Sequence, residues 1–325
     1  MAGFNCTCGT GGIGNLGLPP CNDLLQVVAR LVIVPTYDDD GAKNSIKSTD
    51  FVDGKLPDGY INSKLIESDA SKRWYITDKF FDEVEISNTD RTTQTTSSGA
   101  MYELLQGVVT FTGKLFKRPP SYKGQLNSAK CGENSVFFVD TTGRLMGEVS
   151  TDGTELFPLE MQEGSIIAEY FPKSDSSESY VSFDFQLDRV VSSENFLTIP
   201  SANIEENLKK SESLIDITIS EPTPQESSTA SVVFTANYAL FGTFGNMGTL
   251  EGKVGVDGSD ANWWTVTVNG STGSIASVTE DDGKYTITPT APFTSADTVV
   301  VKYEESRTKS TAKGFESNSL TITIP

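Results

Sequence analysis

The first residues that could carry chemistry lie near the N-terminus. Residues 12–17 read Gly-Ile-Gly-Asn-Leu-Gly, which matches the G-x-G-x-x-G spelling of a dinucleotide-binding loop. Such a loop needs a strand before it and a helix after it, because the helix N-terminus holds the pyrophosphate. No strand pattern precedes Gly12, and Pro19-Pro20 disfavours a helix on its N-terminal side. We therefore expect a glycine-rich extended arm and no cofactor.

The cysteines are the second feature that could carry chemistry. Cys6, Cys8, Cys21 and Cys131 are four thiols, which is enough in number for a tetrahedral zinc site. The C-x-C spacing differs from the usual C-x-x-C pair, and no second pair follows. This spacing favours unpaired thiols, and a disulfide or a metal site are the alternatives.

Composition excludes several classes of enzyme. The chain has 325 residues and no His, which removes serine–histidine and cysteine–histidine nucleophile systems. The acidic runs at 38–40, 82–85 and 280–282 fall in predicted loops and turns, where Asp is favoured for backbone reasons. At 38–41 a turn is favoured over a Ca²⁺ site. We expect no catalytic, metal or cofactor residues, and a carboxylate-dependent glycosidase is a distant alternative.

Strands are the elements that would position any site. Residues 109–115 and 181–187 alternate between apolar and polar side chains, as a half-buried strand does. The apolar stretch at 23–35 includes a strand, and a hairpin is expected over 135–149. Short helices are expected within 62–74 and 121–131. Residues 87–99 are rich in Thr and Ser and are expected to form a long mobile loop.

The pattern predicts a mainly β protein: an antiparallel β-sandwich or barrel with one or two short helices, followed by an immunoglobulin-like β-sandwich. The composition shifts to Pro, Ser, Thr and Glu near residue 221, as in a linker. The expected organisation is an arm at 1–22, a β domain at 23–220, a linker at 221–229 and the immunoglobulin-like domain at 230–325. Trp263 or Trp264 is expected to fill the core of that last domain.

The stretches SVFFVDTTGRLMGEV, DGTELFPL and YVSFDFQLDRV, with the Thr/Ser-rich segment before them, resemble the major tail tube proteins of long-tailed bacteriophages. The part after Pro224 resembles the immunoglobulin-like domains appended to tail tube, capsid and decoration proteins. The resemblance spans most of the chain and has no single diagnostic motif.

The resemblance implies a structural virion protein whose copies form hexameric rings stacked into a tube. It implies assembly in the host cytoplasm and a final place in the phage tail, with other virion proteins at the tube ends and no membrane insertion. The net charge of −19 suits a lumen through which DNA slides without specific binding. Asp184 and Gln186 are expected to face that lumen. The contacts between subunits are expected at the arm and the Thr/Ser segment: Phe4, Cys6, Cys8, Leu16, Leu18, Arg91, Thr93 and Thr95.

A second function stays open at this point. A capsid decoration, fibre or baseplate protein would use its immunoglobulin-like domain to bind a host surface or a glycan. Hollow rings formed by the purified chain would favour the tube, and glycan binding would favour the alternative.

Overall fold

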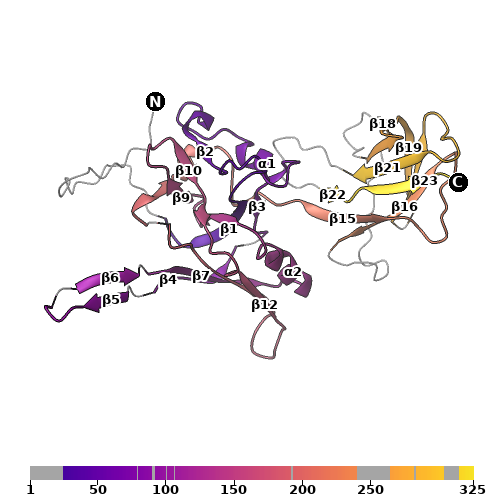
Figure 1. Ribbon diagram of the computed structural model, residues 1–325. Helices are drawn as coiled ribbons and strands as arrows, with labels where there is room; N and C mark the ends of the chain where they lie inside the picture. The colour runs from indigo at the N-terminus through magenta and orange to yellow at the C-terminus, as the bar shows by residue number, and fades with distance from the viewer. Residues whose placement is uncertain are drawn as a thin grey trace. The chain divides into compact units, whose positions relative to one another are not determined.

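The computed structural model describes residues 25–78, 80–89, 92–99, 101–105, 107–191, 193–239, 264–281, 283–303 and 315–325. The chain divides into two compact units, unit 1 over Met1–Glu212 and unit 2 over Ser213–Pro325. Both are built of β-sheets, with two short α-helices in unit 1 (Figure 1). This confirms the predicted fold class, a mainly β protein with antiparallel sheets and short helices.

Unit 1 contains one sheet that is buried on both faces. Its strand order is β2-β10-β9-β8-β1-β3, with β11 paired to β8 and β14 to β9. The strands are β1 (Val28–Pro35), β2 (Ile46–Lys47), β3 (Tyr75–Ile76), β8 (Asn134–Asp140), β9 (Leu145–Val149), β10 (Glu155–Phe157), β11 (Leu159–Glu160) and β14 (Phe196–Ile199). Nearly every residue of β1 and β8 is buried. The apolar run from Leu31 to Val34 in β1 is typical of a strand that is covered on both faces.

The second sheet of unit 1 has one buried and one solvent-facing side. Its order is β12-β13-β7-β4, and all neighbours are antiparallel. The strands are β12 (Ile167–Phe171), β13 (Tyr180–Gln186), β7 (Val109–Phe116) and β4 (Asp82–Asn88). Buried and half-buried residues alternate along β13 and over the last seven residues of β7, as the sequence predicted. A separate pair, β5 (Thr92–Thr95) and β6 (Met101–Leu105), continues beyond β4 and β7.

Phenylalanine rings join the two sheets of unit 1. Phe111 of β7 lies 5.0 Å from Phe185 of β13 and 5.8 Å from Phe138 of β8, measured between ring centroids. All three are fully buried, and Phe81 and Phe183 extend the cluster. Stacked aromatic pairs of this kind contribute about 0.5–1.5 kcal/mol each beyond the burial of their area.

The far face of the first sheet is closed by helix α1 (Tyr60–Leu65) and by the segment around the short 3-10 helix η3 (Ser201–Asn203). Arg30 of β1 is buried, and its guanidinium donates to the carbonyl oxygens of Thr77 and Leu208. Burial lowers the pKa of Arg30 to about 10. The buried Glu206 carboxylate accepts from the backbone N–H groups of Ile61 and Asn62 at the start of α1. These bonds fix the last residues of unit 1 to its core.

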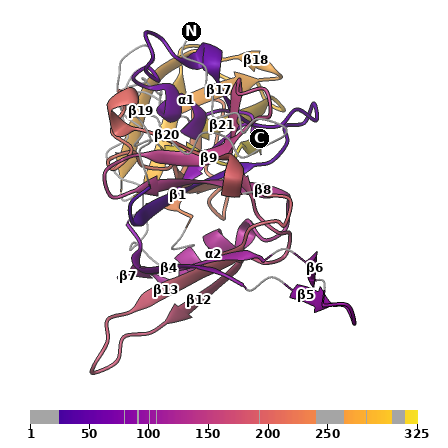
Figure 2. The same ribbon diagram turned by 90° about the vertical axis from the view of Figure 1, so that its left-hand side faces the viewer.

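Helix α2 (Pro120–Ser128) packs beside β12 and β13 (Figure 2). Pro119 and Pro120 begin the helix, since a proline in the first turn loses no helical hydrogen bond. Leu126 points into the phenylalanine core. Two further 3-10 turns, η1 (Ser48–Asp50) and η2 (Ser193–Asn195), complete unit 1.

Unit 2 is a two-sheet sandwich of orders β19-β20-β16-β15-β22 and β18-β17-β21-β23. The strands are β15 (Ile215–Ser220), β16 (Val232–Tyr238), β17 (Trp264–Val268), β18 (Ser271–Thr272), β19 (Ile275–Asp281), β20 (Lys284–Pro289), β21 (Thr298–Tyr303), β22 (Phe315–Ser317) and β23 (Leu320–Thr323). Lettered in chain order, β15, β16, β17, β19, β20, β21 and β23 are A to G. The sheets then read D-E-B-A and C-F-G, the immunoglobulin order. Trp264 fills the core against Phe234, Tyr285 and Tyr303.

Several sequence-based expectations differ from the structure. The acidic run at 82–85 lies in strand β4 and residues 280–281 lie in strand β19, rather than in loops or turns. Residues 87–99 do not form a loop, because they contain the end of β4 and all of β5, and the β-branched Thr residues suit a strand. The helix expected within 62–74 is shorter and starts earlier, at Tyr60. Residues 221–229 are not a linker between units: they connect β15 with β16 inside unit 2, where the Ser227 hydroxyl accepts from the Val233 N–H.

The close approach at Gly147 generates a prediction. An alanine Cβ at this position would lie 2.4 Å from the Phe157 carbonyl oxygen and 2.8 Å from the Phe137 ring, whereas Gly124 in α2 has open space around it. We expect Gly147→Ala to lower the free energy of unfolding by about 2–3 kcal/mol. Gly124→Ala is the control and should raise it by about 0.5–1 kcal/mol. Urea unfolding of both variants measures this, and equal stabilities would contradict it.

Candidate assembly interface

Several residues proposed to contact other subunits lie outside the described residues. These are Phe4, Cys6, Cys8, Leu16, Leu18 and Arg91, and Cys21, one of the four thiols, also lies outside the described residues. Thr93 and Thr95 are described, and both are exposed on β5. Cys131 follows α2 as an exposed free thiol. The glycine-rich stretch at 12–17 also lies outside the described part.

The solvent-facing side of the sheet β12-β13-β7-β4, here called the polar face, brings together both residues expected to face a lumen. The register sets Asp184 opposite Thr112 and Gln186 opposite Thr110. Glu169 and Lys114 flank Ser182 on the neighbouring strands. The acidic side chains of this face are Asp82, Glu85, Glu169 and Asp184, and Glu83 joins them at a bulge in β4.

Negative charge dominates the polar face. Lys114 forms a salt bridge with Glu83 and lies over the Tyr180 ring, 5.1 Å from its centroid. Burial raises the pKa of the Asp184 carboxyl, and the negative charge of Glu169 raises it further. A hydrogen bond with the Thr112 side chain opposes these two effects. The face therefore repels anions such as a phosphate backbone.

The edge at β4 is open in the described part of the chain. The Thr89 N–H donates to the Val108 carbonyl oxygen, and hydrogen-bonded pairs alternate along an antiparallel ladder. The backbone N–H and C=O of Ile86 and Asn88 therefore point away from β7. Within the described residues no hydrogen bond reaches them. Ile86 also exposes 45% of its surface, which is unusual for an apolar residue on a strand edge.

The opposite edge, at β12, is partly closed. The Ala168 N–H donates to Asn127 Oδ1 (3.0 Å), and Asn127 Nδ2 donates to the Ala168 carbonyl oxygen (3.2 Å). By the same alternation, the backbone groups of Tyr170 point outward as well. Nothing in the sequence near Asn127 indicated this role, whereas Ile86 stands out as an apolar residue in a polar stretch.

The hairpin β5–β6 lies at the far end of β4 and β7 and projects from unit 1 (Figure 1). Its pairing runs from Thr92 opposite Leu105 to Thr95 opposite Met101. Met101 is 69% exposed. The hairpin thus carries Thr side chains, and the exposed apolar side chain of Met101 next to its polar turn, away from the core of the unit.

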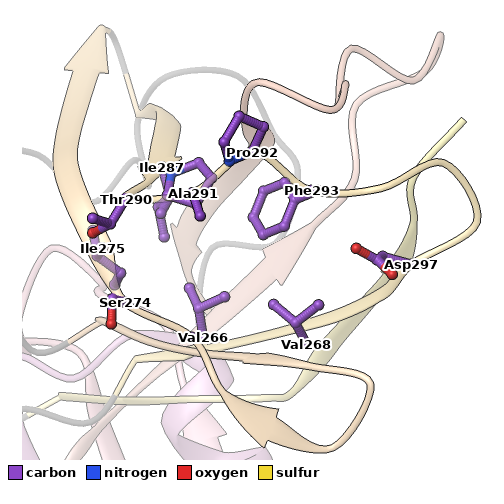
Figure 3. Close-up of a pocket in the computed structure, with 12 residues that line it drawn as sticks. Val266, Val268, Ser274, Ile275, Ile287, Thr290, Ala291, Pro292, Phe293 and Asp297 are labelled. Atoms are coloured by element: carbon purple, nitrogen blue, oxygen red, sulfur yellow. The ribbon is translucent and has the colours of Figure 1, made fainter.

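A cavity of 380 Å³ lies between the sheets of unit 2, beside the segment that follows β20 (Figure 3). Its buried floor is apolar and consists of Val266, Ile275, Ile287 and Phe293. The carboxylate in the lining, Asp297, accepts hydrogen bonds from the Asn269 side chain (2.8 Å) and the Thr294 N–H (2.7 Å). This lining offers apolar contact rather than acid–base chemistry.

The acidic run at 38–40 forms a turn, as predicted. Asp38 Oδ1 accepts from the N–H groups of Asp40 (3.1 Å) and Ala42 (2.7 Å). The Lys72 ammonium lies 3.4–3.7 Å from carboxylate oxygens of Asp38, Asp40 and Asp69. A lysine therefore occupies the centre of these carboxylates. Among the described residues, no group of three or more His, Cys, Asp or Glu side chains is arranged to hold a metal ion.

A second cavity, of 540 Å³, lies in unit 1 beside Lys43. The Lys43 ammonium pairs with Glu160 and sits 4.8 Å from the centroid of the Phe157 ring. Glu148, also in the lining, accepts from the Asn195 side chain at 3.4 Å. Lys43 and Glu160 are thus paired with each other, whereas Glu148 is bonded to an uncharged amide.

Comparison of the chain with protein-family models, with curated proteins and with solved structures finds no match. In the part of the chain that the structure describes, no helix has the length and apolar character needed to cross a bilayer.

The environment of Asp184 predicts a pH-dependent stability. Since its pKa is raised in the folded state, ionisation there opposes folding, and this cost appears as the pH rises above about 3.8. We expect Asp184→Asn to be more stable than the wild type at pH 7, by less than about 1 kcal/mol, and equal to it at pH 3. Urea unfolding of the dilute protein at both pH values measures this. Glu85→Gln, which removes a charge from an exposed position of the same face, is the control, and a less stable Asp184→Asn at pH 7 would contradict the prediction.

Proposed function

We propose that this chain is a structural virion protein of a tailed bacteriophage, the major tail tube subunit, which assembles into stacked hexameric rings. The observation that carries the proposal is the sheet β12-β13-β7-β4. One face of this sheet packs on the core and the other face is acidic. Both edge strands have backbone N–H and C=O groups that point away from the sheet. The ring number of six comes from the resemblance to tail tube proteins.

The even number of strands supports closure of this sheet into a ring. Neighbouring strands are antiparallel throughout, so β4 and β12 run in opposite directions. Rotation of a second copy about a ring axis would set its β12 antiparallel to β4 of the first. Such a head-to-tail contact forms a closed ring when the rotation closes. Closure also removes the exposed strand edges, which are otherwise sites of aggregation.

The chemistry of the polar face supports a conduit for DNA. A ring closed in this way can turn the face with Asp184, Glu169 and Glu85 toward its axis. Carboxylates there repel phosphates, so DNA would pass without the counterion release that drives binding to basic surfaces. In this arrangement Asp184 and Gln186 would line the lumen. No catalytic step is needed for this role.

The hairpin β5–β6 supports contact between rings. It presents Thr93 and Thr95 beyond the sheet, and Met101 gives it an exposed apolar side chain. In stacked rings this hairpin would lie against a neighbouring copy. Unit 2 would be the immunoglobulin-like part of the same subunit, and other virion proteins would cap the tube ends.

The β4 edge gives the test of this proposal. Ile86→Pro removes an N–H that points away from β7, so we expect the intramolecular ladder and the fold to persist. The same change blocks a strand from pairing at β4, and we expect loss of rings and tubes in negative-stain electron microscopy over a concentration series. Ile86→Val, which keeps the N–H and the β-branched side chain, should assemble like the wild type.

Circular dichroism and thermal melting establish that Ile86→Pro is folded. Rings formed by folded Ile86→Pro at wild-type yield would exclude closure through β4. A wild-type chain that stays monomeric at all concentrations would exclude self-assembly, and glycan binding by such monomers would favour a decoration or fibre protein.

A further inference from the structure

A side chain of α2 closes the outer edge of β12 at one residue. The Asn127 amide makes both hydrogen bonds to Ala168, one from its N–H and one to its C=O. A carboxamide has the donor and acceptor of a peptide group, so this pair of bonds reproduces what a neighbouring strand would supply. Asn127 therefore occupies the position of a fifth strand.

The two bonds matter because Ala168 is buried. Its exposed fraction is 2%, so its backbone groups cannot turn to bulk water. Buried backbone groups without partners are costly, and Asn127 supplies the partners here. The helix that carries Asn127 is held in turn by Leu126, which packs in the phenylalanine core. The β12 edge of the single subunit is thus closed from within.

The two edges of the sheet are therefore unequal. At β4, the backbone groups of Ile86 and Asn88 point outward and meet no partner among the described residues. At β12, the backbone groups of Ala168 are already bonded to Asn127. A contact between β4 of one subunit and β12 of another forms at Ala168 only after the Asn127 bonds are exchanged for bonds to the incoming strand.

We infer that Asn127 blocks strand pairing at the β12 edge before assembly. During assembly, β4 of a second copy displaces the Asn127 side chain from Ala168. This inference rests on the proposed self-assembly. The exchange conserves hydrogen bonds, because the incoming strand supplies the same donor and acceptor to Ala168. Asn127 thereby slows assembly and leaves the final pairing intact.

The test compares the assembly kinetics of full-length variants. Asn127→Ala removes both bonds to Ala168, and we expect its assembly lag, followed by light scattering and electron microscopy, to shorten about tenfold. Asn127→Asp keeps the size and the hydrogen-bond acceptor but loses the donor. Its assembly lag should therefore fall between the lags of the wild type and of Asn127→Ala. Asn134→Ala is the matched control. It removes another amide, whose Nδ2 donates to the Ala129 carbonyl oxygen (2.7 Å) at the end of the same helix, without touching β12.

Hydrogen exchange at the Ala168 amide supplies a second readout. We expect slow exchange in the wild-type monomer, fast exchange in the Asn127→Ala monomer, and slow exchange again once either has assembled. A general loss of stability would instead speed exchange across α2 in both Asn127→Ala and Asn134→Ala.

The outcomes separate this inference from the proposed function. If the wild type forms rings and the assembly lag of Asn127→Ala is unchanged or longer, the inferred role of Asn127 is wrong and the proposed tube function stands. Assembly by Asn127→Ala alone, from a wild type that stays monomeric, would support the role of Asn127 and contradict the proposed assembly of the wild-type chain. Monomers in every variant would overturn both.

Discussion

Contact between Phe111, Phe185 and Phe138 is the constraint on which unit 1 depends. These rings connect the two sheets, and their burial fixes which side of β7 and β13 faces inward. A shift of one residue would place phenylalanines in water and would bring Thr112 and Lys114 of β7, or Asp184 of β13, into the core. The polar face is therefore a consequence of the core. Because Phe183 and Phe185 must be inside, Asp184 and Gln186 must be outside.

The edges of that sheet follow from the same register. Once β7 and β13 pair, the alternation of the ladders decides which backbone groups of β4 and β12 point outward. At the β12 edge, Asn127 supplies hydrogen bonds to the backbone groups of Ala168. At the β4 edge, no described residue bonds the outward-pointing backbone groups. A symmetric dimer through β4 would leave the Asn127 bonds at β12 in place. A head-to-tail contact between β4 and β12 exchanges those bonds, and such contacts lead to rings or filaments.

The sequence predicted the elements whose pattern is local. The alternation at 109–115 and 181–187 and the helix at α2 were correct, because side-chain period and proline placement act within a few residues. Residues 87–99 were assigned to a loop, since their composition is polar. Their strand pairing depends on β6 and β7, which follow later in the chain. The bond between Asn127 and Ala168 spans 41 residues, and no local pattern marks it.

The same reasoning explains where unit 1 ends. Its last segment is held by Arg30, which binds the Leu208 carbonyl oxygen, and by Glu206, which binds the N–H groups that begin α1. Each of these buried charges finds its partners within unit 1. Unit 2 has its own closed core around Trp264 and begins with β15, whose partners are β16 and β22. The boundary at residues 212 and 213 therefore falls between the last anchor of one core and the first strand of the next. The sheet β12-β13-β7-β4 and both of its edges belong to unit 1.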